Sequence, residues 1–187
     1  MSEYKSMICI TNRHLCREDF LERIRSLAGI PEIEKIILRE KDMAQEEYES
    51  LAEQCRDICR QAGKPFAVNQ FIRSARKLEI PEVQISFAQM EENREYLREF
   101  SSVGVSVHSS EEARQAEKLG ASYIIAGHIY ATNCKKGIPP RGLSYLKEVC
   151  ASTGLPVYAI GGITPCNMTE VLAAGAAGGC MMSGFMK

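Results

Sequence analysis

The sequence predicts a (β/α)8 TIM barrel built from one domain that spans residues 1–187. Short apolar runs alternate with polar stretches of helical length from one end of the chain to the other, and there are eight such runs. They are rich in Ile and Val, as strands covered on both faces tend to be. The predicted strands are 7–11, 35–39, 65–69, 83–86, 104–108, 123–127, 157–161 and 179–183. The length and an apolar fraction of 45% fit one globular domain.

The stretches between these runs carry helical signals. Segment 47–62 places its apolar side chains at helical spacing. Those residues are Tyr48, Leu51, Cys55, Ile58 and Cys59. Segment 109–119 begins with a serine that has Glu112 three positions later, which is a capping-box pattern. Thr164-Pro165 opens a further helix in the order of cap and then proline.

A doubly wound sheet is the alternative for an alternating pattern of this kind. That fold usually places a glycine-rich loop directly after its first strand. Here the first predicted strand is followed by Asn12-Arg13-His14, and no glycine occurs before Gly29. The barrel is therefore the favoured prediction.

The predicted barrel lacks its last outer helix. The eighth strand is expected to end near Ser183, and the sequence ends at Lys187. We expect apolar surface on the eighth and first strands to face water as a result. A second copy of the chain in a homo-oligomer could cover this surface. If nothing covers it, we expect the protein to be only marginally stable.

Composition argues against several classes of partner. The net charge is −1, with 23 basic and 24 acidic side chains interleaved, so nucleic acid is not an expected partner. No apolar run approaches the roughly 20 residues that span a membrane, and no signal peptide is visible.

The eight cysteines do not have the spacing of a disulfide scaffold, which indicates a reducing, cytoplasmic location. Cys55 and Cys59 could share a metal, but no second pair supports such a site, so we expect apolar packing.

The loop after the predicted sixth strand carries the most chemistry. Active sites of this fold lie where the strands end and the helices begin. His128 is the candidate acid/base, because imidazole titrates near neutral pH and can both give and take a proton. A structural role is its alternative, and His108 and His14 are weaker candidates. Cys134, in the same loop, could be a nucleophile, although no paired base is evident.

Other strand ends supply groups that bind anions or polar substrates. Arg39 and Lys41 lie two residues apart and so share a face, where they could clamp a phosphate. Lys135, Lys136 and Arg141 could add to this positive charge. Asn69 and Ser106 end the third and fifth predicted strands. Gly161-Gly162 and Ser183-Gly184 follow the seventh and eighth strands, where TIM barrels usually bind phosphate, although glycines also permit tight turns.

The chain resembles the thiamine phosphate synthase / TenI family. The resemblance rests on segments 37–41, 105–109, 127–136 and 159–164, and it extends over nearly the whole chain. The family fold is a TIM barrel. Its synthase members join hydroxymethylpyrimidine diphosphate to thiazole phosphate with magnesium. Its TenI-type members isomerise a thiazole carboxylate phosphate tautomer to the aromatic form.

Departures from the synthase pattern favour the tautomerase. The two aspartates that bind magnesium in the synthase correspond to Gln70 and Gln89 here, which removes two charges that a hard divalent ion requires. His128 stands where the synthase favours proline, and Cys134 where it favours threonine. The resemblance therefore implies a tautomerase that needs no metal or other cofactor. The synthase, with Mg²⁺, is the alternative, and a non-catalytic module that binds thiazole or thiamine phosphate is a third.

The resemblance also implies residue roles around a small phosphorylated thiazole substrate. His128 would move a proton from the thiazoline ring carbon to the exocyclic carbon. Substrate contacts are expected from Arg39, Lys41, Asn69, Ser106, Thr132, Cys134 and Lys135. Phosphate contacts are expected from Gly161, Gly162, Met182 and Ser183.

Overall fold

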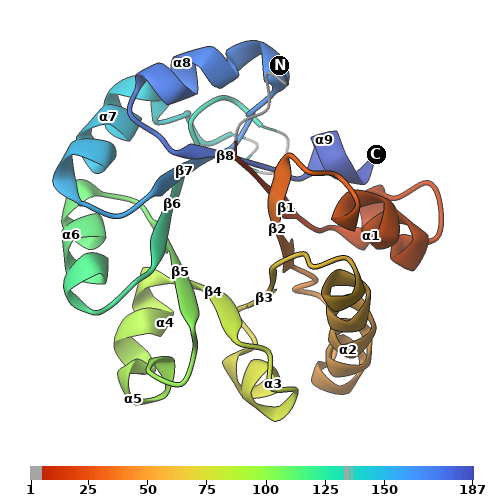
Figure 1. The fold of residues 1–187 in the computed structure, drawn as a ribbon. Coiled ribbons are helices and arrows are strands. Elements are labelled where there is room, and N and C mark those ends of the chain that lie inside the picture. Colours follow the sequence, from red (N-terminus) through yellow and green to blue (C-terminus); the bar gives the residue numbers. More distant parts are fainter. Residues whose placement is uncertain (1–5, 133–134, 136) are drawn as a thin grey trace.

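The computed structural model describes residues 6–132, 135 and 137–187, and its strands form a closed barrel (Figure 1). Neighbouring strands are parallel and follow chain order, and β1 pairs with β8 to close the ring. The strands are β1 (Met7–Ile10), β2 (Ile33–Leu38), β3 (Phe66–Asn69), β4 (Glu82–Ser86), β5 (Ser102–Val107), β6 (Tyr123–Gly127), β7 (Val157–Ile160) and β8 (Gly178–Met181). The predicted TIM barrel is confirmed, and the doubly wound alternative is wrong.

Helices surround this barrel on the outside, as Figure 1 shows. They are α1 (Phe20–Ala28), α2 (Gln45–Gln61), α3 (Ile72–Lys77), α4 (Phe87–Glu92), α5 (Arg94–Leu97), α6 (Ser110–Lys118), α7 (Gly142–Ser152), α8 (Met168–Ala173) and α9 (Ser183–Met186). Short 3-10 turns at Arg13–Leu15 and Pro165–Asn167 precede α1 and α8.

Alternation along the strands separates two apolar layers. Side chains that face the helices join the larger core, whereas those that face the barrel axis form a smaller one. The inner layer contains Ile8, Ile10, Ile37, Ala67, Tyr123, Ile125 and Cys180. Because both strand faces are covered, the strands need continuous apolar runs, which is the pattern that predicted them.

The helix predicted over 47–62 appears as α2 with its apolar stripe turned inward. Tyr48, Cys55 and Cys59 are fully buried, and the Tyr48 hydroxyl donates to the Leu38 carbonyl at 2.8 Å. Burial raises the pKa of the Cys59 thiol to about 12, so this thiol stays neutral. Within the described residues, no group of three or more potential metal-ligating side chains occurs. These cysteines pack as small apolar side chains, as expected.

Two predicted helix starts have different outcomes. Thr164 and Asn167 form a complete capping box, with Pro165 at the first position of the turn. At α6 the Ser109 hydroxyl accepts from the Glu112 N–H at 3.1 Å, as predicted. The Glu112 carboxylate, however, accepts from the N–H of His108 rather than from that of the cap, at 2.7 Å. The capping box expected at α6 is therefore only half formed.

After β8 the described chain forms the single turn α9, which lies between α8 and α1 in Figure 1. Arg23 on α1 holds it by donating to the carbonyls of Phe185 at 2.6 Å and Lys187 at 2.8 Å. Met7 and Met181 are 0% and 7% exposed, so the expectation that the first and eighth strands face water is wrong. What remains is a groove of about 480 Å³ beside α9. The homo-oligomer stays a prediction.

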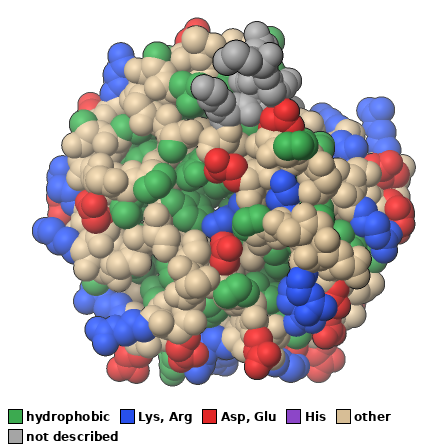
Figure 2. Space-filling model, in the orientation of Figure 1, with side chains coloured by type: hydrophobic (Ala, Val, Ile, Leu, Met, Phe, Trp, Pro, Cys, Tyr) green, Lys and Arg blue, Asp and Glu red, His purple; other side chains and the backbone are tan. Residues whose placement is uncertain are grey.

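Surface charge is mixed and spread over the molecule. On the face drawn in Figure 2, basic and acidic side chains alternate around the rim, and apolar side chains gather nearer the centre. No helix in the described part of the chain is long and apolar enough to cross a membrane.

Candidate functional site

Most of the predicted site residues lie at the ends of the barrel strands, where the chain passes toward the following helix. Side chains at alternate positions face the axis, so Arg39 continues the inward register of Lys35 and Ile37 on β2. Asn69 on β3 and Ser106 on β5 face inward by the same alternation, because their neighbours Val68, Val105 and Val107 belong to the outer core. Because the barrel is closed and its strands are parallel, these strand ends lie at the same end of the barrel.

A buried carboxylate ties the ends of β1 and β2 together. Glu40 is 2% exposed and accepts hydrogen bonds from the Thr11 hydroxyl at 2.7 Å and from the backbone N–H of Arg13 at 3.1 Å. The Arg13 guanidinium bridges this carboxylate to Asp42, at 3.1 Å and 2.7 Å. Arg13 and His14 hold the pKa of the Asp42 carboxyl well below its usual range.

This network positions the cation at the end of β2. The Thr11 hydroxyl accepts the backbone N–H of Arg39 at 2.9 Å while it donates to Glu40. From the sequence, Glu40 was expected with Arg39 and Lys41 at the end of the second strand, but neither its role nor its partner Thr11 was predicted. The available signal in the sequence was a carboxylate, Glu40, between two cations at the end of a buried strand. Its hydrogen-bond partner Thr11 lies 29 residues earlier in the chain, so the pairing could not be inferred.

Three cations converge from two loops. Burial, together with the charges of Arg39 and Lys135, lowers the pKa of the Lys41 ammonium. Lys135 belongs to the loop after β6, and its charge acts on the Lys41 ammonium in the loop after β2. Among the described residues, none of the three forms an ion pair with a carboxylate. A cluster of unpaired cations is suited to bind an anionic group of a ligand.

Asn69, Gln84 and Ser106 form a polar layer inside the barrel. The Asn69 side-chain amide donates to the backbone carbonyl of Gln84 at 3.1 Å, and the Gln84 side-chain amide donates to the Ser106 hydroxyl at 3.0 Å. Asn69 Oδ1 and Gln84 Oε1 are buried and have no hydrogen-bond partner within the described structure. Gln84, which is 2% exposed, was missed from the sequence because a single polar residue in an apolar run gave no sign of its partners.

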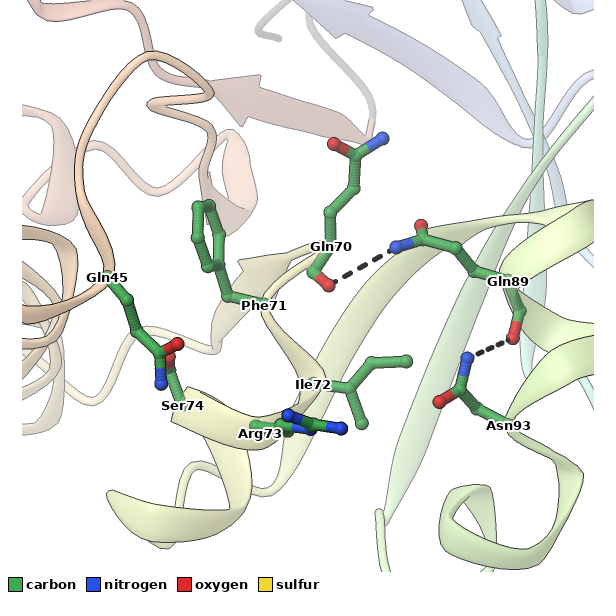
Figure 3. A pocket seen from close by; sticks show the side chains of 8 residues that line it. All are labelled: Gln45, Gln70, Phe71, Ile72, Arg73, Ser74, Gln89 and Asn93. Atoms are coloured by element: carbon green, nitrogen blue, oxygen red, sulfur yellow. Dashed lines mark hydrogen bonds between the residues drawn. The ribbon is translucent and has the colours of Figure 1, made fainter.

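Gln70 and Gln89 lie at the positions that correspond to the magnesium-binding aspartates of the synthase pattern. They line a pocket of about 230 Å³ between α3 and α4 (Figure 3). The Gln89 oxygen accepts the Ser86 N–H at 3.2 Å in a capping box, and its amide nitrogen donates to the Gln70 carbonyl at 3.3 Å. The Gln70 side chain extends away from Arg73 and Asn93 in Figure 3, and its backbone has a left-handed φ of 67°.

This arrangement does not fit a magnesium ion. Mg²⁺ in proteins is usually bound through one or two carboxylates in near-octahedral geometry. Neither Gln70 nor Gln89 carries a charge, and the Gln89 amide already has protein partners at both of its ends. These two positions therefore cannot supply the carboxylate ligands that the synthase pattern implies.

His128 is buried at the start of the loop that follows β6. It is 8% exposed, and its Nε2 lies 3.2 Å from the carbonyl oxygen of Ile138. A carbonyl can only accept, so Nε2 is the donor in this contact, and in the neutral imidazole Nδ1 is then the nitrogen with a free lone pair. The loop is closed further by the N–H of Arg141, which donates to the His128 carbonyl at 2.9 Å.

Gly161 and Gly162 bring the end of β7 against this loop. Both have positive φ, 96° and 66°. A Cβ atom on Gly161 would overlap His128, and one on Gly162 would lie 2.7 Å from the Cβ of Tyr130. Only glycine permits this close approach of the two backbones. Met182 and Ser183 follow β8, and the Asn12 amide contacts the Met182 sulfur at 3.7 Å.

Other residues proposed from the sequence lie elsewhere or are held by protein contacts. Thr132 is half-buried in the loop after β6, while Cys134 and Lys136 lie outside the described residues. Arg141 donates to the His108 carbonyl at 3.0 Å and lies over the ring of Tyr145, so its guanidinium serves the structure of the loop.

Known proteins resemble this chain along nearly its whole length. Residues 7–185 match the family model described as thiamine monophosphate synthase. The thiamine-phosphate synthase of Moorella thermoacetica is 34% identical over 187 residues, which cover 98% of this chain and 88% of that protein. A probable thiamine biosynthetic bifunctional enzyme of Oryza sativa subsp. japonica is 36% identical over 140 residues, covering 74% of this chain. The match spans only about a quarter (26%) of the rice protein's length.

A solved structure has the same architecture. The thiamine phosphate pyrophosphorylase from Pyrococcus furiosus superimposes with a TM-score of 0.82 at 30% sequence identity, covering 97% of this chain and 86% of that one. The matched family model, the relatives and the shared barrel agree with the resemblance seen in the sequence. The chain belongs to the thiamine monophosphate synthase family.

Proposed function

We propose that this protein is a thiazole tautomerase that aromatises a thiazole carboxylate phosphate by proton transfer through His128. The observation that carries the proposal is the pair Gln70 and Gln89, which replaces the two aspartates of the synthase pattern with neutral amides. Gln89 is engaged by Ser86 and by the Gln70 carbonyl. An isomerisation that only moves a proton needs no metal to neutralise a diphosphate leaving group, so losing these carboxylates is compatible with it.

The state of His128 suits a base that later acts as an acid. The Ile138 carbonyl fixes the proton on Nε2 and leaves Nδ1 to accept one. In the proposed step Nδ1 takes the proton from the thiazoline ring carbon, and the electrons of that C–H bond become part of the aromatic ring. The exocyclic double bond then takes the same proton at its outer carbon. Substrate and product have the same atoms, and aromaticity drives the reaction forward.

Substrate charge is assigned to two parts of the mouth. Arg39, Lys41 and Lys135 form the cation cluster and are suited to hold the carboxylate. The phosphate is assigned to the backbone at Gly161 and Gly162 and to Met182 and Ser183, where the loops after β7 and β8 usually bind phosphate in this fold. The same cations could instead hold a diphosphate.

A second candidate is the thiamine-phosphate synthase reaction, which the names of the similar proteins favour. Those names belong to proteins that are 34% and 30% identical to this chain. The synthase would require magnesium and would release diphosphate, so magnesium must then be held without carboxylates at positions 70 and 89. A module that binds the thiazole phosphate and turns nothing over is the third outcome to be tested.

The test follows aromatisation of the thiazole carboxylate phosphate tautomer by ultraviolet absorbance in the presence of EDTA. We expect a metal-independent rate that falls about 100- to 10,000-fold in His128→Asn, the usual range for removal of a general acid/base. His108→Asn is the matched control, because this histidine also ends a strand but is exposed. Circular dichroism would show that each variant is folded.

A parallel assay adds magnesium, thiazole phosphate and hydroxymethylpyrimidine diphosphate and measures the release of diphosphate. Turnover there, with no tautomerase rate, would replace our proposal by the synthase. Silence in both assays, with the thiazole phosphate still bound in calorimetry, would leave the binding module.

A further inference from the structure

Gln84 occupies a central position in the polar layer inside the barrel. It lies in the middle of β4, is 2% exposed, and pairs in register with Gly104 on β5. A side chain at Gly104 would overlap both the Gln84 amide and the ring of Tyr123. A glycine inside a strand weakens that strand, so its presence here indicates that the space is used by the neighbouring glutamine.

The orientation of the Gln84 amide is fixed by a backbone carbonyl. Its Nε2 lies 3.3 Å from the carbonyl oxygen of Ile85 and 3.0 Å from the Ser106 hydroxyl. Because a carbonyl can only accept, the atom between these two groups must be the nitrogen. Ser106 Oγ therefore accepts a hydrogen bond from Gln84, and its own proton is left to donate elsewhere. Among the described residues this hydroxyl donates to none.

The backbone of the same residue sets the orientation of Asn69. Asn69 Nδ2 donates to the backbone carbonyl of Gln84 at 3.1 Å. Because a carbonyl can only accept, the Asn69 side-chain atom that faces it must be the nitrogen. Asn69 Oδ1 is thereby left as a buried acceptor without a partner in the described structure. One residue of β4 thus makes its neighbour on β5 a donor and its neighbour on β3 an acceptor.

We propose that Gln84 is a positioning residue that orients Ser106 as a hydrogen-bond donor toward the substrate while Asn69 stays an acceptor. The ligand group beside Ser106 must be an acceptor, such as a carboxylate oxygen or a ring nitrogen. An anion is excluded beside Asn69 Oδ1, because two acceptors would face each other. This inference rests on the proposed function, since the group that Ser106 contacts belongs to the substrate of that reaction.

Gln84→Glu reverses the polarity with little change in shape. The new carboxylate only accepts, so the Ser106 proton turns toward it and is lost to the substrate. We expect kcat/KM at neutral pH to fall about 10- to 100-fold, the usual range for losing a hydrogen bond to a charged group. Gln54→Glu, on the exposed face of α2, is the matched control and should leave kcat/KM unchanged.

The pH profile separates this role from a general structural one. Burial raises the pKa of a carboxyl, and a protonated carboxyl can again donate to Ser106. The rate of Gln84→Glu relative to wild type should therefore recover as the pH falls. Among the described residues, the titratable groups of the inner layer beside this position include Tyr123, whose pKa is raised far above its usual range by burial, together with its neighbours Tyr158 and Cys180. The Lys35–Glu82 ion pair lies one layer along the axis. Each is present in wild type and variant alike.

A double-mutant cycle with Ser106→Ala tests whether Gln84 acts through Ser106. If it does, Gln84→Glu should change kcat/KM less than about twofold in the Ser106→Ala background. If the glutamate variant does not fold, Gln84→Met takes its place, because methionine has a similar length but cannot donate a hydrogen bond. Gln84→Met should lower kcat/KM, and this loss should not recover at low pH. Multiplicative effects in the cycle would overturn the inference.

The wild-type rate is measured first, so that two kinds of failure are distinguished. If the wild type catalyses only the synthase reaction, the proposed function fails and the cycle is run in that assay, with the same expectation for Ser106. If it catalyses neither, the proposed function and the role of Gln84 in it fail together. An active wild type with independent effects of Gln84 and Ser106 overturns the positioning role alone.

Discussion

Replacing Gly161 by alanine tests the contact between β7 and the loop that carries His128. Gly161 has φ of 96°, in the region that side chains other than glycine rarely adopt. An added Cβ would overlap the His128 Cβ and lie 2.8 Å from its Cα. These atoms belong to the backbone and to the first carbon of a side chain, so they cannot move aside without moving the loop.

The expected loss of unfolding free energy has two parts, and an alanine substitution at Gly120 measures one of them alone. Gly120 has a similar φ of 91°, but nothing lies within 4 Å of the position its Cβ would occupy. Alanine at Gly120 should therefore cost only the left-handed conformation, about 1–2 kcal/mol of unfolding free energy. Gly161→Ala should cost the same amount plus about 1–3 kcal/mol for forcing an extra carbon into a packed site.

Urea denaturation followed by circular dichroism measures both variants. We expect Gly161→Ala to lose about 2–5 kcal/mol in all, and its Tm to fall further than that of Gly120→Ala by about 2–4 °C for each additional kcal/mol. The tautomerase rate should fall in Gly161→Ala alone, because the displaced loop carries His128. Equal losses of stability in the two variants would refute the close contact, because the cost of the left-handed backbone conformation alone would then explain both losses.

Three further predictions concern charge and backbone. Glu40→Gln removes the buried negative charge that accepts from Arg13 and puts a donor NH2 in place of one carboxylate oxygen, so it should lower the unfolding free energy in urea by about 1.5–3 kcal/mol; an unchanged value would show that the pair contributes nothing. Hydrogen bonds from Lys77 and other groups lower the pKa of Glu49 to about 2. Its contribution to stability is therefore complete above about pH 4.5 and is lost as the pH falls through about 2, and Glu49→Gln should flatten the decline of Tm with acid over that range. Gln70→Asn should raise the unfolding free energy by about 0.5–1 kcal/mol, because asparagine tolerates a left-handed backbone better, and a lower Tm would contradict this.

Local patterns in the sequence were sufficient for the elements of the barrel. The run 123–127 was predicted with the bounds that β6 has, because five consecutive buried residues leave a continuous apolar signal. The inward direction of Arg39 also followed from alternation along one strand. Both predictions depend only on neighbours in sequence, which a periodic pattern records directly.

Interactions between distant segments were not predictable in this way. Glu40 meets Thr11 across 29 residues, and Gln84 meets Ser106 across 22, so neither pairing leaves a periodic trace in the sequence. At α6, the predicted cap formed but the glutamate bonded to the preceding residue instead, because two N–H groups compete for one carboxylate. The expected exposure beside β8 was wrong because Arg23, from the start of the chain, anchors the last turn.

The sequence by itself determined the order of strands and helices, the barrel class, and the strand ends at which polar groups gather, because these depend on periodicity and on local turn signals. Only the tertiary structure decided which polar atoms meet, which of them remain without a partner, and how tightly Gly161 approaches His128. The reason is physical: a hydrogen bond or a close contact requires alignment within a few tenths of an ångström, and closure of the barrel sets that alignment between strands far apart in the chain.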